Sequence, residues 1–170
     1  DLLSGERAEV SGTTDLELPD YVDEILASGF PGIRTLGERA REVRLDGYID
    51  RIIDVEFPEL GHRVRRPASL RAWLAAYAAA TASTTSYDAL LRAATPGHDD
   101  KPSKATTIAY RDTLERLWLL DPVTGWWPTR NSFGRLARSP KHHLADPALA
   151  ARLLGVGRRH LLSNQTPAPH

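Results

Sequence analysis

The sequence contains no cysteine and no methionine. Without cysteine, the chain can form neither a disulfide framework nor a thiolate metal site. A complete translated chain starts with methionine, whereas this one starts at Asp1. We therefore expect it to be a piece of a longer protein, in which domains before and after these 170 residues are its first partners.

Several functional patterns are absent as well. No run of about 18 apolar residues is present, which predicts that no segment crosses a membrane. The phosphate-binding patterns G-x-x-x-x-G-K-[ST] and G-x-G-x-x-G are missing. The metalloprotease pattern H-E-x-x-H and the hydrolase pattern G-x-S-x-G are missing too. We therefore expect no cofactor and no metal in this chain, and a cytoplasmic location.

Charge is unevenly divided along the chain, although the formal net charge is zero. Residues 1–60 contain 15 acidic and 6 basic residues, a net charge of −9, while residues 61–170 contain 7 acidic and 16 basic residues, a net charge of +9. Either the two halves pack on each other, or the acidic half docks on something basic. Alternatively, the basic half faces an anionic partner such as duplex DNA.

The first third of the chain is predicted to be helical with short breaks. Residues 1–17 show no sustained period and are expected to form a loop. A proline and an aspartate at the start and a glycine after the end predict a helix over Leu18–Ser28. Gly29–Arg34 is expected to be a tight, non-helical turn, and an apolar stripe predicts a long helix over Thr35–Phe57. Prolines and a glycine near residues 58–67 predict a boundary between two sub-domains.

The stretch Ser103–Trp127 organises the second half of the chain. It predicts a helix capped by its first serine, followed by strand-forming residues over Leu119–Trp127. The apolar residues of this helix recur on one face, at Tyr110, Leu114, Leu117 and Trp118. Helices over Leu70–Thr81 and Ser86–Thr95 precede it. This order of helix, turn, longer helix and strand is typical of a winged helix-turn-helix.

The end of the chain completes this pattern. Phe133–Leu136 is predicted to be a return strand, and Lys141–Ala145 a short extended piece. A helix is predicted over Pro147–Leu154, closed by Gly155. Residues 156–170 are expected to be a linker tail.

The predicted fold class is mainly α. A helical N-terminal part over residues 18–60 is followed by a winged helix-turn-helix domain with a small β wing over residues 69–155. The inward positions of three consecutive helices are expected to share one core, formed by Trp73, Tyr77, Leu90, Tyr110, Leu114 and Leu117.

The candidate binding residues are basic or apolar side chains on the second helix of this motif and on its wing. They are Lys101, Lys104, Ile108, Arg111, Arg130, Arg135, Arg138 and Lys141. In a winged helix, the second helix lies in the major groove and the wing contacts the DNA backbone, so cations at these places suit phosphates. However, Asp112 and Glu115 on the same helix face repel phosphate. Ile108 beside two alanines is more typical of a protein-docking surface.

A second candidate cluster comprises His142, His143 and Asp146. Neighbouring side chains of an extended segment point to opposite faces, so the two imidazoles cannot both reach one ion without a kink. For a histidine–aspartate acid/base pair, the sequence offers no candidate nucleophile. These residues are therefore expected to be structural.

Five motifs occur together in a fixed order. They are G-F-P-G-I-R at Gly29–Arg34, L-D-G-Y-I-D-R-I-I-D at Leu45–Asp54, T-S-Y-D-A-L-L at Thr85–Leu91, T-x-x-x-Y-R-D-T-L-E-R-L at Thr106–Leu117, and S-P-K-H-H-L-A-D-P-A-L-A-A-R-L-L-G at Ser139–Gly155. In this combination, nearly the whole chain resembles the region that follows the P-loop domain in a large family of prokaryotic AAA-type ATPases with a C-terminal domain of unknown function.

The resemblance implies that residues 18–60 are lid-like linking helices and that residues 69–155 are a winged-helix part. It also implies that ATP and Mg²⁺ bind to the P-loop domain of the longer protein, because the Walker motifs are absent from this chain.

Three functional hypotheses follow. The first is a non-catalytic accessory region of an AAA-type ATPase, which couples the ATPase core to a partner or to nucleic acid. The alternative is a winged-helix DNA-binding regulator. For the accessory region itself, we expect that duplex DNA binds weakly and without sequence preference. The third is an enzyme centred on His142, His143 and Asp146.

Overall fold

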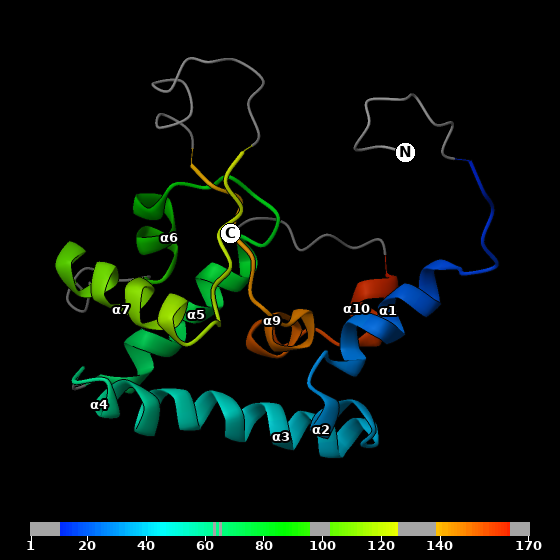
Figure 1. Cartoon of the computed structure of the whole chain (residues 1–170), viewed down its shortest axis with the longest axis horizontal. Coiled ribbons are helices and arrows are strands. Elements are labelled where there is room, and N and C mark those ends of the chain that lie inside the picture. The colour runs from blue at the N-terminus through cyan, green and yellow to red at the C-terminus, as the bar shows by residue number, and fades with distance from the viewer. Residues whose placement is uncertain (1–10, 63, 65, 96–102, 126–138, 164–170) are drawn as a thin grey trace, which may run out of the picture.

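The computed structural model describes residues 11–62, 64, 66–95, 103–125 and 139–163. The chain is mainly helical over these residues (Figure 1). Its elements in chain order are α1 (Leu18–Ala27), α2 (Pro31–Arg34), α3 (Glu38–Arg51), the π-helical turn η2 (Ile52–Glu56), α4 (Phe57–Glu59), α5 (Pro67–Ala79), α6 (Tyr87–Ala93), α7 (Lys104–Arg116), α9 (Pro147–Leu154) and α10 (Arg158–Leu162).

The first helix has the predicted limits within one residue. The Glu17 amide donates to the Asp20 carboxylate at 2.8 Å, and Pro19 stands in the first turn, where its missing N–H is not needed. The following segment differs from the prediction, because Pro31–Arg34 forms the short helix α2. Pro31 occupies the first turn of that helix, where the fixed φ of proline suits a helical backbone and its missing N–H is not needed.

The long predicted helix is one helical run from Glu38 to Glu59 with a wide turn inside it. The π-helical turn η2 separates α3 from α4, and the Phe57 amide donates to the Ile52 carbonyl, five residues back. Pro58 follows directly and has no amide hydrogen to continue an α-helix. A π-turn beside a proline is a common place for a helix to change direction. The run ends at Glu59, and Gly61, two residues later, has φ = +83°.

The helices α6 and α7 both begin at serine caps: Ser103 was predicted as a cap, whereas Ser86 was predicted as the first residue of its helix. The Ser86 hydroxyl accepts from the Ala89 amide at 3.2 Å, and the Ser103 hydroxyl accepts from the Thr106 amide at 3.1 Å. Each bond satisfies one of the amides that the first turn of a helix leaves unpaired. Polar side chains at the two caps therefore set where both helices start.

The predicted β wing is not found among the described residues. Pairing there consists of isolated bridges, which join Thr81 to His142, Leu120 to Leu144 and Val123 to Lys141. The last two bridges share one antiparallel register, in which the Asp121 amide donates to the His143 carbonyl and Val123 and Lys141 exchange two hydrogen bonds, at 2.9 Å each. The predicted return strand over Phe133–Leu136 lies outside the described residues.

The end of α7 also corrects the sequence analysis. Trp118 was placed on the apolar face with Leu114, but its side chain is 85% exposed. The helix ends one turn earlier than the stripe suggests, and the Leu119 amide donates to the Leu114 carbonyl at 2.9 Å. The Trp118 amide donates to the Glu115 carbonyl, which completes a Schellman-type helix end. In that geometry Trp118 takes φ = +57° and turns away from the core.

Helix α5 lies at the centre of the core. Its aromatic residues Trp73 and Tyr77 are buried, with ring centroids 5.3 Å apart, and Tyr110 of α7 meets Trp73 edge-on. Phe57 packs edge-on against Tyr110 from the other side. All six predicted core residues are in or against this cluster, with Leu117 only partly buried. The aromatic contacts therefore join α4, α5 and α7 into one core.

Helix α9 joins the two halves of the chain, because it packs on α5, α3 and α1 (Figure 1). It begins at Pro147 and ends at Gly155, as predicted, with φ = +65° at that glycine. The core therefore includes residues from both sides of the predicted boundary near residues 58–67.

Helix α10 was not predicted, since residues 156–170 were expected to be a linker. It packs along α1 (Figure 1), and Arg158 donates to both oxygens of Asp23, at 2.7 and 3.3 Å. Among the described residues, none of the helices has the length and apolar character needed to cross a membrane.

Candidate docking surface on α6 and α7

The surface between α6 and α7 contains three of the predicted binding residues, Lys104, Ile108 and Arg111. A hollow of about 310 Å³ opens between these helices. Apolar and aromatic side chains lie at its base and charged side chains at its rim. Its lining includes Trp73, Tyr87, Leu91, Lys104, Ile108 and Arg111. The volume is at the low end of the range for ligand and side-chain pockets.

Arg111 is held by three neighbours on this surface. Its guanidinium lies 4.7 Å from the centre of the Tyr87 ring, its Nη2 is 3.2 Å from Asp112, and its Nε is 3.5 Å from Glu115. Partial burial opposes the charged form, but Tyr87 and the two carboxylates outweigh it and raise the pKa of Arg111. Arg111 is therefore a permanently charged but locally compensated group.

Lys104 is compensated in the same way. Its Nζ lies 3.8 Å from the Asp88 carboxylate of α6, and both side chains are well exposed. Ile108, one turn further along α7, is 42% exposed. The described part of this surface is thus apolar at Ile108 and close to neutral around it.

The other predicted binding residues are divided between two places. Lys141 is exposed and lies in the extended segment bridged to Val123. Lys101, Arg130, Arg135 and Arg138 lie outside the described residues. The structure therefore groups Lys104, Ile108 and Arg111, and gives Lys141 a position on the extended segment.

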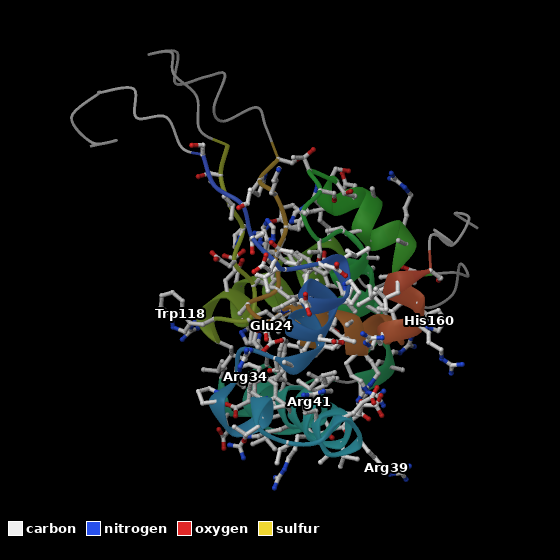
Figure 2. All side chains as sticks on the ribbon, turned by 90° about the vertical axis from the view of Figure 1, so that its right-hand side faces the viewer. Glu24, Arg34, Arg39, Arg41, Trp118 and His160 are labelled. Atoms are coloured by element: carbon white, nitrogen blue, oxygen red, sulfur yellow. The ribbon has the colours of Figure 1, made fainter. Side chains whose placement is uncertain are left out.

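Trp118 is an exposed aromatic residue that the sequence analysis missed. Figure 2 shows its side chain projecting from the edge of the molecule. A bulky residue at positive φ is an outlier, because its Cβ crowds the backbone in the left-handed region. The available signal was the end of the α7 stripe: a residue just after a C-cap leaves the helix face, whatever its hydrophobicity.

In the histidine cluster, the side chains of His142 and Asp146 are buried and hydrogen-bonded. His142 is fully buried, with Nε2 2.6 Å from the Thr85 carbonyl and Nδ1 3.2 Å from the Tyr77 hydroxyl. A carbonyl only accepts, so Nε2 carries the proton, and in the neutral ring Nδ1 accepts from Tyr77. Burial raises the pKa of Tyr77 far above its ordinary value, which keeps that hydroxyl protonated.

Asp146 makes separate contacts, none of them with His142. Its carboxylate accepts from the Ser28 hydroxyl and the Gly29 amide and caps α9 through the Ala148 and Leu149 amides. No group of three or more acidic or histidine side chains that could hold a metal ion occurs within the described residues. Within the described residues, His142 and Asp146 therefore contact different partners.

A match to a known protein family covers most of the chain. The match to the family described as "Domain of unknown function (DUF8612)" covers residues 18–160. The chain belongs to this family. No curated protein and no solved structure matches the chain.

The family match begins at the first residue of α1 and ends inside α10. It therefore includes the N-terminal helices, the α6–α7 surface and α9 as one unit of sequence. The α10 segment, first taken as a linker, falls largely within the matched region.

Proposed function

We propose that this DUF8612 chain is a non-catalytic accessory region of a cytoplasmic AAA-type ATPase, and that its α6–α7 surface docks a neighbouring protein domain. The motif order of the sequence supports the ATPase context. The observation that carries the docking function is the local neutralisation of the α7 cations. Lys104 and Arg111 both have carboxylate partners, while Ile108 and Trp118 are exposed.

The charges of the surface favour protein over nucleic acid. A phosphate approaching Arg111 meets Asp112 and Glu115 at the same guanidinium and must compete with both. DNA-binding surfaces instead present cations that release counterions from the backbone. Exposed apolar and aromatic side chains with arginine nearby are typical of protein-interface hot spots.

The experiment pairs this chain with the P-loop domain that the resemblance implies for the same reading frame. Binding is measured by isothermal titration calorimetry, and ATP hydrolysis by steady-state phosphate release. We expect direct binding, and we expect Ile108→Asp to weaken it at least about tenfold, the size of a modest hot spot. This chain alone should release no phosphate above background.

Leu154→Ser is the matched control, because Leu154 is 41% exposed and lies on α9, away from this surface. It should leave the affinity unchanged. Equal losses for Ile108→Asp and Leu154→Ser would contradict the location of the docking surface. A reading frame that encodes no P-loop domain would contradict the ATPase context.

A DNA-binding regulator remains the second candidate, because the net charge of +9 over residues 61–170 favours some affinity for duplex DNA. The helix order of α5, α6 and α7, with paired extended segments after it, also suits a winged helix. A regulator should bind one duplex tightly at physiological salt, whereas electrostatic attraction alone should give weak binding, with a Kd on the order of 10⁻⁴–10⁻⁶ M, that falls steeply with salt.

Fluorescence anisotropy with two unrelated duplexes separates the two candidates. A Kd in the nanomolar range for one duplex at physiological salt would favour the regulator. Equal and weak binding to both duplexes, little changed by replacing Lys104 and Arg111 with alanine, is the result expected of a docking surface.

A further inference from the structure

An apolar stripe on α1 faces away from the rest of the molecule. Leu18, Tyr21 and Ile25 recur at i, i+3 and i+7, and their residues are 60%, 52% and 37% exposed. Val22 of the same helix is only 3% exposed, on the side that packs against α9 and α10. Helix α1 therefore buries one side and leaves a second apolar side open. Single exposed apolar residues are common. Three on the same side of one helix form a stripe of the kind that helices use to pack against another helix.

An acidic stripe runs beside the apolar one. Glu17, Asp20 and Glu24 each precede one residue of the apolar stripe, so they have the same i, i+3, i+7 spacing. Residues 11–33 contain five acidic residues and no lysine, arginine or histidine. Arg34 pairs with Glu24, and both side chains remain about half exposed (Figure 2). Glu24 is therefore partly compensated, and the negative charge of this border comes mainly from Glu17 and Asp20.

These charges favour some binding partners of the α1 stripe over others. A second copy of this chain would bring the acidic stripe of one α1 against that of another, and like charges at an interface cost affinity. An anionic lipid surface or a nucleic acid would meet the same repulsion. A helix with an apolar stripe bordered by lysine or arginine would bury the three apolar residues and pair with the carboxylates.

We propose that the exposed side of α1, formed by Leu18, Tyr21 and Ile25 with the acidic stripe Glu17, Asp20 and Glu24, is a docking site for a basic amphipathic helix. This surface is separate from the α6–α7 surface. The proposal therefore stands independently of the docking function assigned to Ile108.

The experiment measures binding of labelled synthetic peptides to the 170-residue chain by fluorescence anisotropy. The probe is a helix of about 18 residues with leucine at i, i+3, i+4 and i+7 and lysine elsewhere. One comparator replaces every lysine with glutamate, and the other scrambles the leucine and lysine order. We expect the Leu/Lys helix to bind at least about tenfold more tightly than either comparator, and more weakly at high salt.

The double variant Tyr21→Ser with Ile25→Ser should weaken binding of the Leu/Lys helix at least about tenfold. Its far-UV circular dichroism should match that of the wild type, because both side chains are already half exposed or nearly so. Val43→Ser is the matched control: Val43 is 64% exposed on α3, outside the stripe, and the variant should bind as the wild type does.

Four results would overturn the proposal. They are equal binding of the scrambled peptide, equal binding of the Leu/Glu helix, equal loss in Val43→Ser, and no binding of the Leu/Lys helix. A dimer in sedimentation equilibrium that disappears in the double variant would make a second copy the occupant and would also overturn it. None of these outcomes changes the Ile108→Asp test of the proposed function.

Discussion

The Ser28 hydroxyl donates to the Asp146 carboxylate at 2.6 Å and links residues 118 positions apart in the chain. The same carboxylate oxygen accepts from the Gly29 amide at 2.9 Å, and the other oxygen caps α9 through the Ala148 amide at 2.7 Å. Ser28 and Asp146 are both almost fully buried. One side chain therefore ends the α1 segment, starts α9 and holds the two together.

Replacing Asp146 with alanine should lower the free energy of unfolding by about 2–4 kcal/mol. The change removes an N-cap and leaves buried donors from Ser28 and Gly29 without an acceptor. Urea denaturation at neutral pH measures the loss. Asp121→Ala, at an exposed position, is the control and should change stability by less than about 0.5 kcal/mol. Similar values for the two variants would show that the Asp146 contacts contribute little.

Replacing Leu114 with alanine should cost about 2–5 kcal/mol, as buried leucine truncations do. Leu114 is fully buried, in the core cluster that also contains Trp73 and Tyr110. Leu154→Ala is a suitable comparison, because that leucine is 41% exposed. An unchanged denaturation midpoint for Leu114→Ala would be incompatible with this core.

The helices with strong local end signals were predicted well. Ser86 and Ser103 start α6 and α7, and Gly155 ends α9 in the left-handed conformation that glycine favours. Each signal acts within a few residues, so it can be recognised from the sequence alone. The mainly helical fold class and the shared aromatic core followed from these helices and their apolar spacing.

The predictions that were wrong concern features that the spacing of apolar residues does not encode. The π-helical turn Ile52–Glu56 adds a residue to one turn, and a periodic pattern does not show such an insertion. Helix α10 is only five residues long and packs on α1, which is distant in sequence. Its stability depends on that packing, because short isolated helices are marginal in water.

The candidate surface was predicted in part. The outward positions of Lys104, Ile108 and Arg111 follow from the α7 pattern, and so do the carboxylates at Asp112 and Glu115 on the same helix. The pairing of Lys104 with Asp88 does not follow, because it depends on how α6 crosses α7. This tertiary contact adds a carboxylate from α6 to a helix face whose own charges are already mixed.

The Arg152–Asp46 pair predicts a pH dependence of stability. Arg152 donates to the two Asp46 oxygens at 2.7 and 2.6 Å, and this hydrogen bonding lowers the pKa of Asp46 in the folded chain. The pair therefore stabilises the fold above the unfolded-state pKa of about 4, and that contribution is lost as the pH falls through the lower folded-state pKa. Because Asp46 is 43% exposed, the contribution should be below about 1 kcal/mol.

Asp46→Asn tests this dependence through urea denaturation at several pH values. The stability difference between wild type and variant should be largest near neutral pH and should shrink as the pH falls below about 4. Leu154→Ala, which changes an exposed side chain that does not ionise, should show no such trend. A constant difference at all pH values would mean that the Asp46 charge is not coupled to folding.

The last prediction concerns Trp118, whose φ of +57° places a bulky residue where helices usually end in glycine. The left-handed conformation costs a non-glycine residue roughly 1–2 kcal/mol, and a side chain that is 85% exposed recovers little of this by burial. Trp118→Gly should therefore raise the free energy of unfolding by up to about 1 kcal/mol, after the greater flexibility of glycine in the unfolded chain is counted. Trp118→Ala keeps the Cβ strain and should change stability little. Urea denaturation of both variants separates the backbone effect from the loss of the indole ring.

If Trp118→Gly were the less stable of the two, the ring would contribute to packing that its exposure does not show. A more stable glycine variant would show that the tryptophan is maintained at a cost to stability, as expected for a side chain that binds a partner.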